Sequence, residues 1–312
     1  MAASLADTVA GIKTVVVLGS GAMGAGIAQV LAQSGYSVIV RDTEERFLKK
    51  GKEGIEDSLS RLVKKGTISL SDKDGILSRL KLTTEFEKVK NGDFIIEAVT
   101  EDLEIKKEVF RQLDSLAKPE AVIATNTSSL SVTELALCTK RGGKVVGMHF
   151  FNPVPVMKLV EVVRTGLTSQ ETFQTTWDLA KKMGKEPIEA QDTPGFIFNR
   201  LIIPYLNEAF WAVYEGIGKV EDIDKAMKLG GNMPIGPLQL LDLVGLDVQL
   251  HACETLYREF GDPKFRPCPL NRFMVRMGYL GRKVKKGFYD YVADPPVPTI
   301  IDTGVKYRIG SH

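Results

Sequence analysis

The sequence predicts an α/β fold with a doubly wound, mostly parallel sheet, followed by an all-helical C-terminal domain. Short β-branched runs alternate with helical patterns through residues 1–191, and a glycine-rich turn follows the first of these runs. From residue 192 onward only helical patterns remain. Such an alternation is typical of a parallel sheet with helices on both faces. We therefore expect domains at residues 1–191 and 192–294, and a tail at 295–312.

The composition is that of a globular protein, with 312 residues, 44% of them hydrophobic, and a formal net charge of +2. Lysines and arginines are interleaved with acidic residues, which argues against a nucleic-acid-binding protein. The three cysteines form no C-x-x-C pair. We therefore expect neither a zinc site nor another metal site, and no disulfide framework.

Residues 14–40 carry no charge and are long enough to span a bilayer. The stretch contains five glycines and its periodicity changes partway, which argues against a membrane helix. The N-terminus lacks the basic region of a signal peptide and the arginine-rich character of a transit peptide. We expect a cytoplasmic protein, and the mitochondrial matrix is the alternative if a presequence has been removed.

The first elements form a strand–turn–helix–strand unit. A strand is predicted at residues 14–18, a helix at 25–33 and a second strand at 36–40, and G-S-G-A-M-G precedes the helix. Asp42 follows the second strand, 18 residues past Gly24. This order and spacing match the dinucleotide-binding pattern of a Rossmann-type domain.

Each residue type in this unit has a physical reason. Gly19 allows the tight turn, Gly21 lets the backbone approach a pyrophosphate, and Gly24 lets helix and strand pack closely. Asp42 can accept hydrogen bonds from ribose hydroxyls, which favours NAD over NADP, although the neighbouring Arg41 could accommodate a 2′-phosphate. The alternative is a glycine turn that binds nothing. The residues that this pattern assigns to the cofactor are Gly19, Gly21, Gly24 and Asp42.

The next element is a long polar helix at residues 43–65, with Phe47, Ile55, Leu59 and Leu62 on its inward face. The alternation then continues to the end of the first domain. Strands are predicted at 93–99, 121–124, 144–150 and 158–163 and after residue 184, and helices at 103–113, from 131 and at 168–183.

Polar residues follow the strand at residues 121–124, namely Asn126, Ser128 and Ser129. His149 lies at the end of the strand at 144–150. Ligands of open α/β sheets bind at the carboxyl ends of the strands, so we expect these side chains near a ligand.

Residues 158–163 read K-L-V-E-V-V, a buried-strand pattern with a carboxylate inside it. Burying an ionised carboxylate without a partner is costly, so Glu161 requires one. The short connection N-P-V-P-V follows the strand that ends at His149, so imidazole and carboxylate can face each other. Such a pair holds the imidazole in one tautomer and makes it a better base. Read singly, His149 can be a structural residue and Glu161 can face solvent at a sheet edge.

A proton-transfer pair beside a nicotinamide suits the oxidation of a substrate hydroxyl. Ser128 could hold the substrate hydroxyl or carbonyl. Asn199, from the helical half, could orient the carbonyl oxygen or the nicotinamide. Its alternative role is that of a polar residue on a helix surface.

In the helical half, Thr193 is predicted to cap a helix whose first residue is Pro194. Further helices are expected at residues 221–229 and 238–260, with a break in the second at Gly245. This half has more apolar surface than a small isolated bundle normally exposes. We therefore expect a homodimer that forms through it.

Several long motifs resemble one enzyme family. GSGAMGAGIA, NTSSLSVTELA, GMHFFNPVPVMKLVEVV, DTPGFIFNRLIIPYLNEA, DIDKAMKLGGNMPIGPLQLLDLVGLD and GRKVKKGFYDY are similar to motifs of the L-3-hydroxyacyl-CoA dehydrogenases, including the 3-hydroxybutyryl-CoA enzymes. The resemblance runs from about residue 12 to about residue 291. It implies NAD-dependent oxidation of an L-3-hydroxyacyl-CoA to a 3-ketoacyl-CoA and the reverse, a β-oxidation step of fatty acid metabolism.

The resemblance also implies roles for individual residues. His149 and Glu161 match the family's acid–base pair, and Ser128 and Asn199 match its residues at the substrate. Lys285 stands where the family usually has glycine, and the tail after residue 292 lies outside the pattern. The implied contacts with coenzyme A are Ser58, Lys65 and Ser128. The implied cofactor contacts are the whole glycine turn (Gly19, Ser20, Gly21, Ala22, Met23 and Gly24), Asp42, Glu101, Lys106, Ser128 and Asn152, with Lys283 a weaker one.

Two other functions remain open. One is a dehydrogenase of a free hydroxy acid, as in the gulonate dehydrogenase and lambda-crystallin relatives. Ser58 and Lys65 argue against it, since a free acid has no nucleotide tail to hold. The other is a non-catalytic NAD-binding protein.

Overall fold

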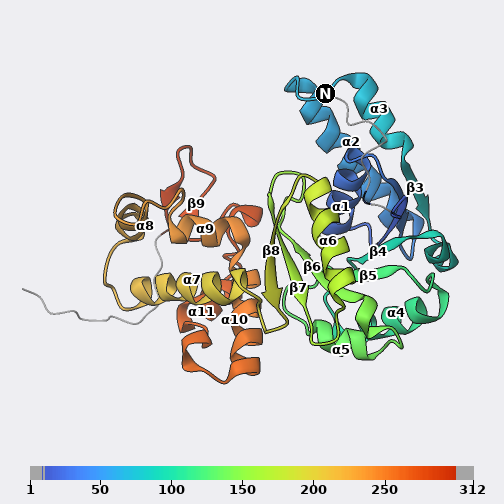
Figure 1. Cartoon of the computed structure of the whole chain (residues 1–312). Helices are drawn as coiled ribbons and strands as arrows, with labels where there is room; N and C mark the ends of the chain where they lie inside the picture. The colour runs from blue at the N-terminus through green and yellow to red at the C-terminus, as the bar shows by residue number, and fades with distance from the viewer. Residues whose placement is uncertain (1–8, 10, 300–312) are drawn as a thin grey trace, which may run out of the picture. The chain divides into compact units, whose positions relative to one another are not determined.

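The computed structural model describes residue 9 and residues 11–299, and the chain forms two compact units, Met1–Phe196 and Ile197–His312. The first unit holds a sheet with helices, and the second is almost entirely helical (Figure 1). The division falls after Phe196, slightly beyond the predicted domain end at residue 191. Most of the predicted tail, residues 300–312 with His312, lies outside the described residues.

The sheet of the first unit has eight strands in the order β3-β2-β1-β4-β5-β6-β7-β8. Neighbouring strands are parallel except β6 and β7, which confirms the mostly parallel sheet predicted from the sequence. The chain runs outward from β1 to β3 and returns to β4, so the strand order reverses between β1 and β4, where ligands of such sheets bind. The strands are β1 (Thr14–Leu18), β2 (Ser37–Arg41), β3 (Leu80–Thr83), β4 (Phe94–Glu97), β5 (Val122–Thr125), β6 (Val145–Phe150), β7 (Leu159–Arg164) and β8 (Glu186–Gln191).

Both faces of this sheet are buried. In β1, Val15 and Val17 belong to one apolar cluster, whereas Val16 and Leu18 belong to the other. Helices α1, α2, α3 and α6 contribute to the first cluster, and α4 and α5 contribute to the second. Burial of both faces explains the continuous apolar runs of the strands. The helices are α1 (Ala22–Gln33), α2 (Glu45–Lys64), α3 (Leu70–Ser78), α4 (Leu103–Leu116), α5 (Val132–Leu137) and α6 (Gln170–Lys182), with short 3₁₀ turns η2 (Phe86–Asn91) and η3 (Gly142–Lys144).

The inward face of α2 differs from the prediction at one position. Ile55 and Leu59 are buried as expected, but Phe47 is 40% exposed and Leu48 is buried instead. Residues 48, 55 and 59 lie seven and four positions apart, which places them on one helical face, and residue 47 lies off it. The guanidinium of Arg46 lies 4.8 Å from the centroid of the exposed Phe47 ring.

The sequence did not reveal α3 and β3. Ile76 is the one fully buried residue of α3, so this helix has almost no apolar pattern. Its start is set instead by a capping box between Ser69 and Asp72. Strand β3 forms the edge of the sheet and is only half-buried.

The second unit begins its first helix later than predicted. Helix α7 starts at Phe198, so the predicted start at Thr193 and Pro194 is wrong. Gly195 and Phe196 have φ angles of 78° and 49°, which are incompatible with a right-handed helix. The helices of this unit are α7 (Phe198–Tyr214), α8 (Val220–Leu229), α9 (Pro237–Val244), α10 (Leu246–Phe260) and α11 (Pro269–Arg276), with 3₁₀ turns η4 (Pro263–Phe265) and η5 (Arg282–Val284).

Gly245 ends α9 and begins α10 with a φ of 106°, which confirms the predicted break. Lys285 adopts the left-handed conformation with a φ of 60°. This explains why a glycine would be favourable at position 285. A two-stranded sheet, β9 (Tyr289–Asp290) and β10 (Val297–Pro298), follows.

Two buried carboxylates hold the end of this unit to its helices. Asp242 of α9 accepts hydrogen bonds from the backbone N–H of Phe288 (2.8 Å) and Tyr289 (2.9 Å) and from the hydroxyl of Tyr291 (3.0 Å). Asp224 of α8 accepts one from the hydroxyl of Tyr289 at 2.7 Å. The segment after η5 is therefore bound through carboxylates rather than through apolar packing alone.

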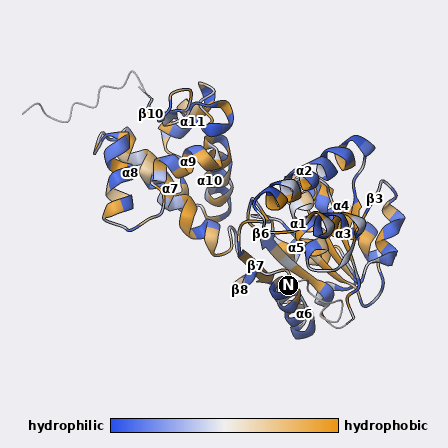
Figure 2. Ribbon diagram, turned by 90° about the horizontal axis from the view of Figure 1, so that it is seen from above, coloured by the Kyte–Doolittle hydropathy of each residue, from blue (hydrophilic) through white to orange (hydrophobic). Residues whose placement is uncertain are grey.

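Hydrophobic and hydrophilic residues are distributed differently over the strands and the helices. Figure 2 shows hydrophobic residues along the strands of the sheet, while the helices carry both hydrophilic and hydrophobic residues. Among residues 9 and 11–299, no helix has the length and apolarity that crossing a membrane requires. The uncharged stretch at residues 14–40 is divided between β1, α1 and β2.

Candidate active site

The glycine turn after β1 is set by two close approaches. Gly19 has a φ of 94°, and a Cβ there would lie 2.4 Å from the carbonyl oxygen of Ala98. A Cβ on Gly24 would lie 2.0 Å from the carbonyl oxygen of Gly19. Both positions therefore require glycine for the fold itself.

Gly21 differs, because a Cβ there would meet nothing within 4 Å. Its φ of −62° does not require glycine either. This glycine faces open space at the N-terminus of α1, where no side chain caps the helix and the first turn holds no acidic residue. Unpaired N–H groups and the positive end of the helix dipole attract phosphate, so these residues fit a dinucleotide pyrophosphate.

Asp42 lies beside this turn, at the end of β2. Its Oδ2 accepts hydrogen bonds from the backbone N–H (2.7 Å) and the hydroxyl (2.6 Å) of Ser20, and its Oδ1 accepts one from the N–H of Thr43 (2.7 Å). Burial raises the pKa of Asp42, but these hydrogen bonds outweigh burial and hold the pKa below its usual value. The carboxylate is thus ionised and positioned at the turn, as ribose recognition requires.

Arg41 is directed to the neighbouring strand. Its guanidinium lies 4.9 Å from the centroid of the Phe86 ring, and Nε donates to the carbonyl oxygen of Thr84 at 3.4 Å. These contacts engage Arg41 beside β3.

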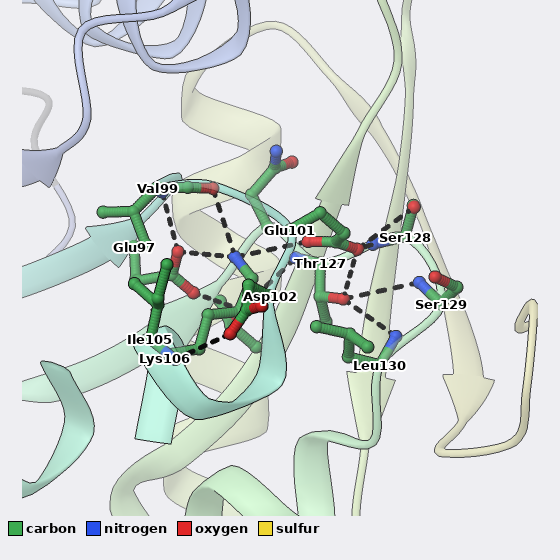
Figure 3. A network of polar contacts seen from close by, with 12 residues as sticks. Glu97, Val99, Glu101, Asp102, Ile105, Lys106, Thr127, Ser128, Ser129 and Leu130 are labelled. Atoms are coloured by element: carbon green, nitrogen blue, oxygen red, sulfur yellow. Dashed lines mark hydrogen bonds and ion pairs between the residues drawn. The ribbon is translucent and has the colours of Figure 1, made fainter. Parts of the chain in front are cut away.

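A polar network occupies the carboxyl ends of β4 and β5 (Figure 3). Oε1 of Glu101 accepts hydrogen bonds from the hydroxyl of Thr127 (2.6 Å) and from the N–H (2.8 Å) and hydroxyl (3.2 Å) of Ser128. Oε2 of Glu101 lies 3.3 Å from Nζ of Lys106. Burial raises the pKa of Glu101, but the ammonium of Lys106 and these hydrogen bonds together outweigh burial. The pKa of the carboxyl therefore lies below its usual value.

Sequence reasoning missed the buried centre of this network, Glu97. Lys106 is 1% exposed, and its Nζ lies 2.6 Å from Oε1 of Glu97, which is 0% exposed. The predicted cofactor residues Glu101 and Lys106 and the predicted substrate residue Ser128 are thus brought together, with Lys106 enclosed behind Glu101. Glu97 stands inside a buried strand, the same signal that singled out Glu161, and that signal could have found it.

His149 and Glu161 lie opposite each other in the antiparallel pairing of β6 and β7. Nδ1 of His149 is 2.7 Å from Oε2 of Glu161, so the expected pairing is present. His149 is 6% exposed and Glu161 is fully buried. The rings of Phe151 and Phe196 lie 4.6 and 5.7 Å from the imidazole, measured between centroids. The carboxylate thus engages Nδ1 of the imidazole, and two aromatic rings lie against its ring.

The loop after β5 is tied to the strand that ends with this pair. Oδ1 of Asn126 accepts a hydrogen bond from the N–H of Phe150 at 2.9 Å, and the N–H of Asn126 donates to the carbonyl oxygen of Glu97 at 2.8 Å. The sequence had placed Asn126 near the ligand. In the structure, Asn126 connects the loop that carries Ser128 to β6.

Asn152 is exposed at the start of the connection between β6 and β7. Sequence reasoning missed a buried lysine beneath this connection. Nζ of Lys185 donates to the carbonyl oxygen of Met157 at 2.8 Å and to that of Val154. Burial lowers the pKa of Lys185, which is 6% exposed. Lys185 thereby secures the segment that follows Asn152.

The remaining predicted residues belong to α2 and to the second unit. Ser58 is half-buried in α2, and Lys65 is exposed at the residue that ends this helix. Asn199 lies in the first turn of α7, and Nζ of Lys283 lies 2.6 Å from both carboxylate oxygens of Asp247. Asn199 and Lys283 belong to the second unit, and their contribution to the site stays a prediction.

Comparison with known proteins covers nearly the whole chain. A family model described as the NAD binding domain of 3-hydroxyacyl-CoA dehydrogenase matches residues 14–193. A model described as the C-terminal domain of the same enzyme matches residues 195–291. The meeting point of the two models agrees with the division of the structure into two units.

Individual relatives give the same picture. The 3-hydroxybutyryl-CoA dehydrogenase of Clostridioides difficile is 50% identical over 275 residues, 88% of this chain and 98% of the relative. Mouse mitochondrial hydroxyacyl-coenzyme A dehydrogenase is 45% identical over 288 residues, 90% of this chain and 91% of the relative. The crystal structure of (S)-3-hydroxybutyryl-CoA dehydrogenase from Ralstonia eutropha has a TM-score of 0.86 and 46% identity, covering 90% of this chain and 99% of that one.

Proposed function

Because the chain belongs to the 3-hydroxyacyl-CoA dehydrogenase family and is an NAD-dependent oxidoreductase of that class, we propose that His149 and Glu161 perform the proton transfer of its reaction. The observation that carries this proposal is the 2.7 Å contact between imidazole Nδ1 and the buried carboxylate. A carboxylate at Nδ1 fixes the tautomer and raises the basicity of Nε2, which a general base requires.

In the oxidation, Nε2 of His149 takes the proton of the 3-hydroxyl group while the C3–H bond breaks and the ketone forms. When bound, NAD⁺ supplies the acceptor of the hydride that leaves C3. Glu161 stabilises the imidazolium that results. In the reduction, the imidazolium returns its proton to the 3-keto oxygen, so the same two residues serve both directions.

Two side chains complete the substrate site in this proposal. Ser128 holds the substrate hydroxyl or carbonyl, supported by its position in the network with Glu101. Asn199 orients the carbonyl oxygen or the nicotinamide. Hydrogen bonds of this kind fix the distance between the reacting atoms, which is a large part of catalysis.

The proposed cofactor contacts are supported by the open space at Gly21 and the ionised Asp42. We assign the pyrophosphate to the turn at Gly19–Gly24, the adenosine ribose to Asp42 and the nicotinamide half to the region of Glu101 and Asn152. Lys283 is assigned a weaker contact. Lys106 acts through Glu101, because its ammonium is enclosed.

The acyl-CoA substrate follows from the family, and we assign the nucleotide tail of coenzyme A to Ser58 and Lys65 of α2. Ser58 and Lys65 lie seven positions apart, on the same side of this helix. An exposed lysine suits the phosphates of coenzyme A. A free hydroxy acid would leave both residues without a role.

The test is the loss of NADH absorbance with acetoacetyl-CoA, compared with acetoacetate and with NADPH in place of NADH. We expect rapid turnover only with the thioester and NADH. Turnover of acetoacetate at a similar rate would favour the free-acid dehydrogenase. Binding of NADH without turnover of either substrate would favour a non-catalytic role.

We also propose a homodimer formed through the helical unit. Large apolar side chains that are more than half exposed recur in this unit, and such surface is typical of an interface. They are Leu201, Ile217, Leu229, Leu243, Met277 and Val292. Light scattering should give a mass of about twice 34.3 kDa, and a mass equal to one chain would contradict the dimer.

The three cysteines are free, which supports a reducing compartment such as the cytoplasm or the mitochondrial matrix. Cys253 and Cys268 are fully buried, and burial raises their pKa to about 12 and about 11. Cell fractionation tests the location, and recovery of the protein with a membrane or secreted fraction would contradict it.

A further inference from the structure

We propose that Glu97 is a positioning residue of the cofactor site. It holds Glu101 in place through Lys106, and the network of these three residues carries one net negative charge, which favours NAD⁺ over NADH. The proposal rests on the proposed function in one respect, that the nicotinamide lies beyond the carboxyl ends of β4 and β5.

Both carboxylate oxygens of Glu97 accept hydrogen bonds from groups of the protein. Its Oε1 accepts from the N–H of Val99 at 2.7 Å and lies 2.6 Å from Nζ of Lys106. Its Oε2 accepts from the hydroxyl of Thr125 at 2.7 Å. With 0% of its surface exposed, Glu97 does not contact a bound cofactor, so it acts through its neighbours and through its charge.

Lys106 transmits this effect to the edge of the site. Its ammonium lies between Glu97 and Glu101, at 2.6 and 3.3 Å from their oxygens. The other oxygen of Glu101 accepts hydrogen bonds from the hydroxyl of Thr127 and the backbone N–H of Ser128 (Figure 3). Glu101 is therefore held from two sides, and loss of Glu97 releases the ammonium from one of its two carboxylates.

The formal charges of the network do not cancel. Glu97 and Glu101 carry two negative charges, and Lys106 carries one positive charge. Asp102, exposed beside the network at the N-terminus of α4, adds further negative charge. The nicotinamide ring is cationic in NAD⁺ and neutral in NADH, so a fixed negative charge stabilises the oxidised form selectively.

The test is the dissociation constant of each nucleotide, measured without acyl-CoA by fluorescence titration of wild type and Glu97→Gln. The substitution removes one charge and keeps the shape of the side chain. We expect the ratio of the NAD⁺ constant to the NADH constant to rise about threefold to tenfold. A folded Glu97→Gln whose ratio stays within about twofold of wild type would overturn the proposal.

Asp93 provides a matched control at the other end of the same strand. Its carboxylate also lies 2.6 Å from a lysine, Lys118, and also accepts backbone N–H groups, from Lys13 and Thr14. Asp93→Asn therefore removes the same charge and the same kind of pair at the amino edge of the sheet. Its ratio should equal that of wild type, and an equal rise in both variants would contradict a local effect.

If Glu97→Gln does not fold, Glu101→Gln carries the test, because this side chain is 35% exposed. The same rise in the ratio is expected, and an unchanged ratio would count against the proposal. Since no acyl-CoA is present, this experiment is independent of turnover. A wild-type protein that binds both nucleotides but does not turn over the thioester would contradict the proposed function alone.

Discussion

His149 Nδ1 lies 2.7 Å from Glu161 Oε2, and the two residues are direct partners in the register of β6 and β7. Successive side chains of a strand point to opposite faces, so a slip by one residue would place Glu161 on the other face. The sheet register therefore defines the pair. It also explains how a carboxylate can stand inside the otherwise apolar strand β7.

Replacing either member of the pair should abolish most of the turnover. We expect His149→Gln and Glu161→Gln to lower kcat at least about a hundredfold while NADH binding stays nearly unchanged. Steady-state kinetics and NADH titration measure the two effects separately. His251→Gln, at an exposed histidine of α10, is the control and should retain full activity. Near-normal turnover in folded His149→Gln would remove this residue from the mechanism.

The two glycines at the start of α1 should respond differently to alanine. Gly21→Ala should keep the melting temperature but weaken NADH binding at least about tenfold, because its methyl group would enter only the open space of the cofactor site. Gly24→Ala should lower stability by about 2 kcal/mol or more, since its Cβ would meet the carbonyl oxygen of Gly19. Thermal unfolding and NADH titration distinguish the two. Normal NADH binding by Gly21→Ala would show that the pyrophosphate lies elsewhere.

Asp42 should determine the choice between NADH and NADPH. Asp42→Asn removes the charge that would repel a 2′-phosphate, so we expect the preference for NADH in kcat/KM to fall at least about tenfold. Ser20→Ala is the control, because it removes the 2.6 Å hydrogen bond to Asp42 but leaves the charge. If only Ser20→Ala lost the preference for NADH over NADPH, the geometry of the turn rather than the charge of Asp42 would determine the selectivity.

Asp242 should give the helical unit a characteristic pH dependence. Burial raises its pKa from 3.8 to about 6, against the hydrogen bonds that it accepts. Because the folded pKa lies above the unfolded one, the contribution of Asp242 to stability is fully present below pH 3.8 and is lost as pH rises to about 6.

The measurement is the free energy of unfolding of wild type and Asp242→Asn between about pH 4 and pH 7. The advantage of wild type over the variant should shrink by up to about 3 kcal/mol as pH rises. Asp222→Asn, at an exposed carboxylate of α8, should follow the pH dependence of wild type. A wild-type advantage that grows with pH would contradict the raised pKa.

Local pattern was enough to predict the first unit's sheet and the cofactor turn, since alternation, glycine spacing and Asp42 are visible along the chain. It was also enough to indicate the partner of Glu161. It did not reveal α3 and β3, whose burial is slight, because the hydrophobic pattern records only burial. The left-handed residues before α7, Gly195 and Phe196, were missed because the backbone conformation of Phe196 has no signal in composition.

The burial of two lysines was missed for a different reason. Lys106 and Lys185 are residue types that normally face solvent, and only their tertiary partners make burial possible. Glu97 could have been found from the sequence. The segment F-I-I-E at residues 94–97 places a glutamate in an apolar strand, as V-E-V-V at residues 160–163 does. A carboxylate inside a buried strand requires a partner wherever it occurs.

The proposed proton-transfer pair, His149 and Glu161, lies only 12 positions apart in the chain, within β6, β7 and their connection. Most of the proposed cofactor residues, by contrast, follow β1, β2, β4 and β5, whereas Asn152 lies in the β6–β7 connection itself. Recombination would therefore affect the proton-transfer pair and the cofactor residues differently. A recombination event that exchanges the β6–β7 hairpin as one piece keeps acid and base from the same parent. A crossover inside the connection after Asn152 joins one parent's histidine to the other parent's glutamate, so its survival depends on both lineages having kept the same strand register.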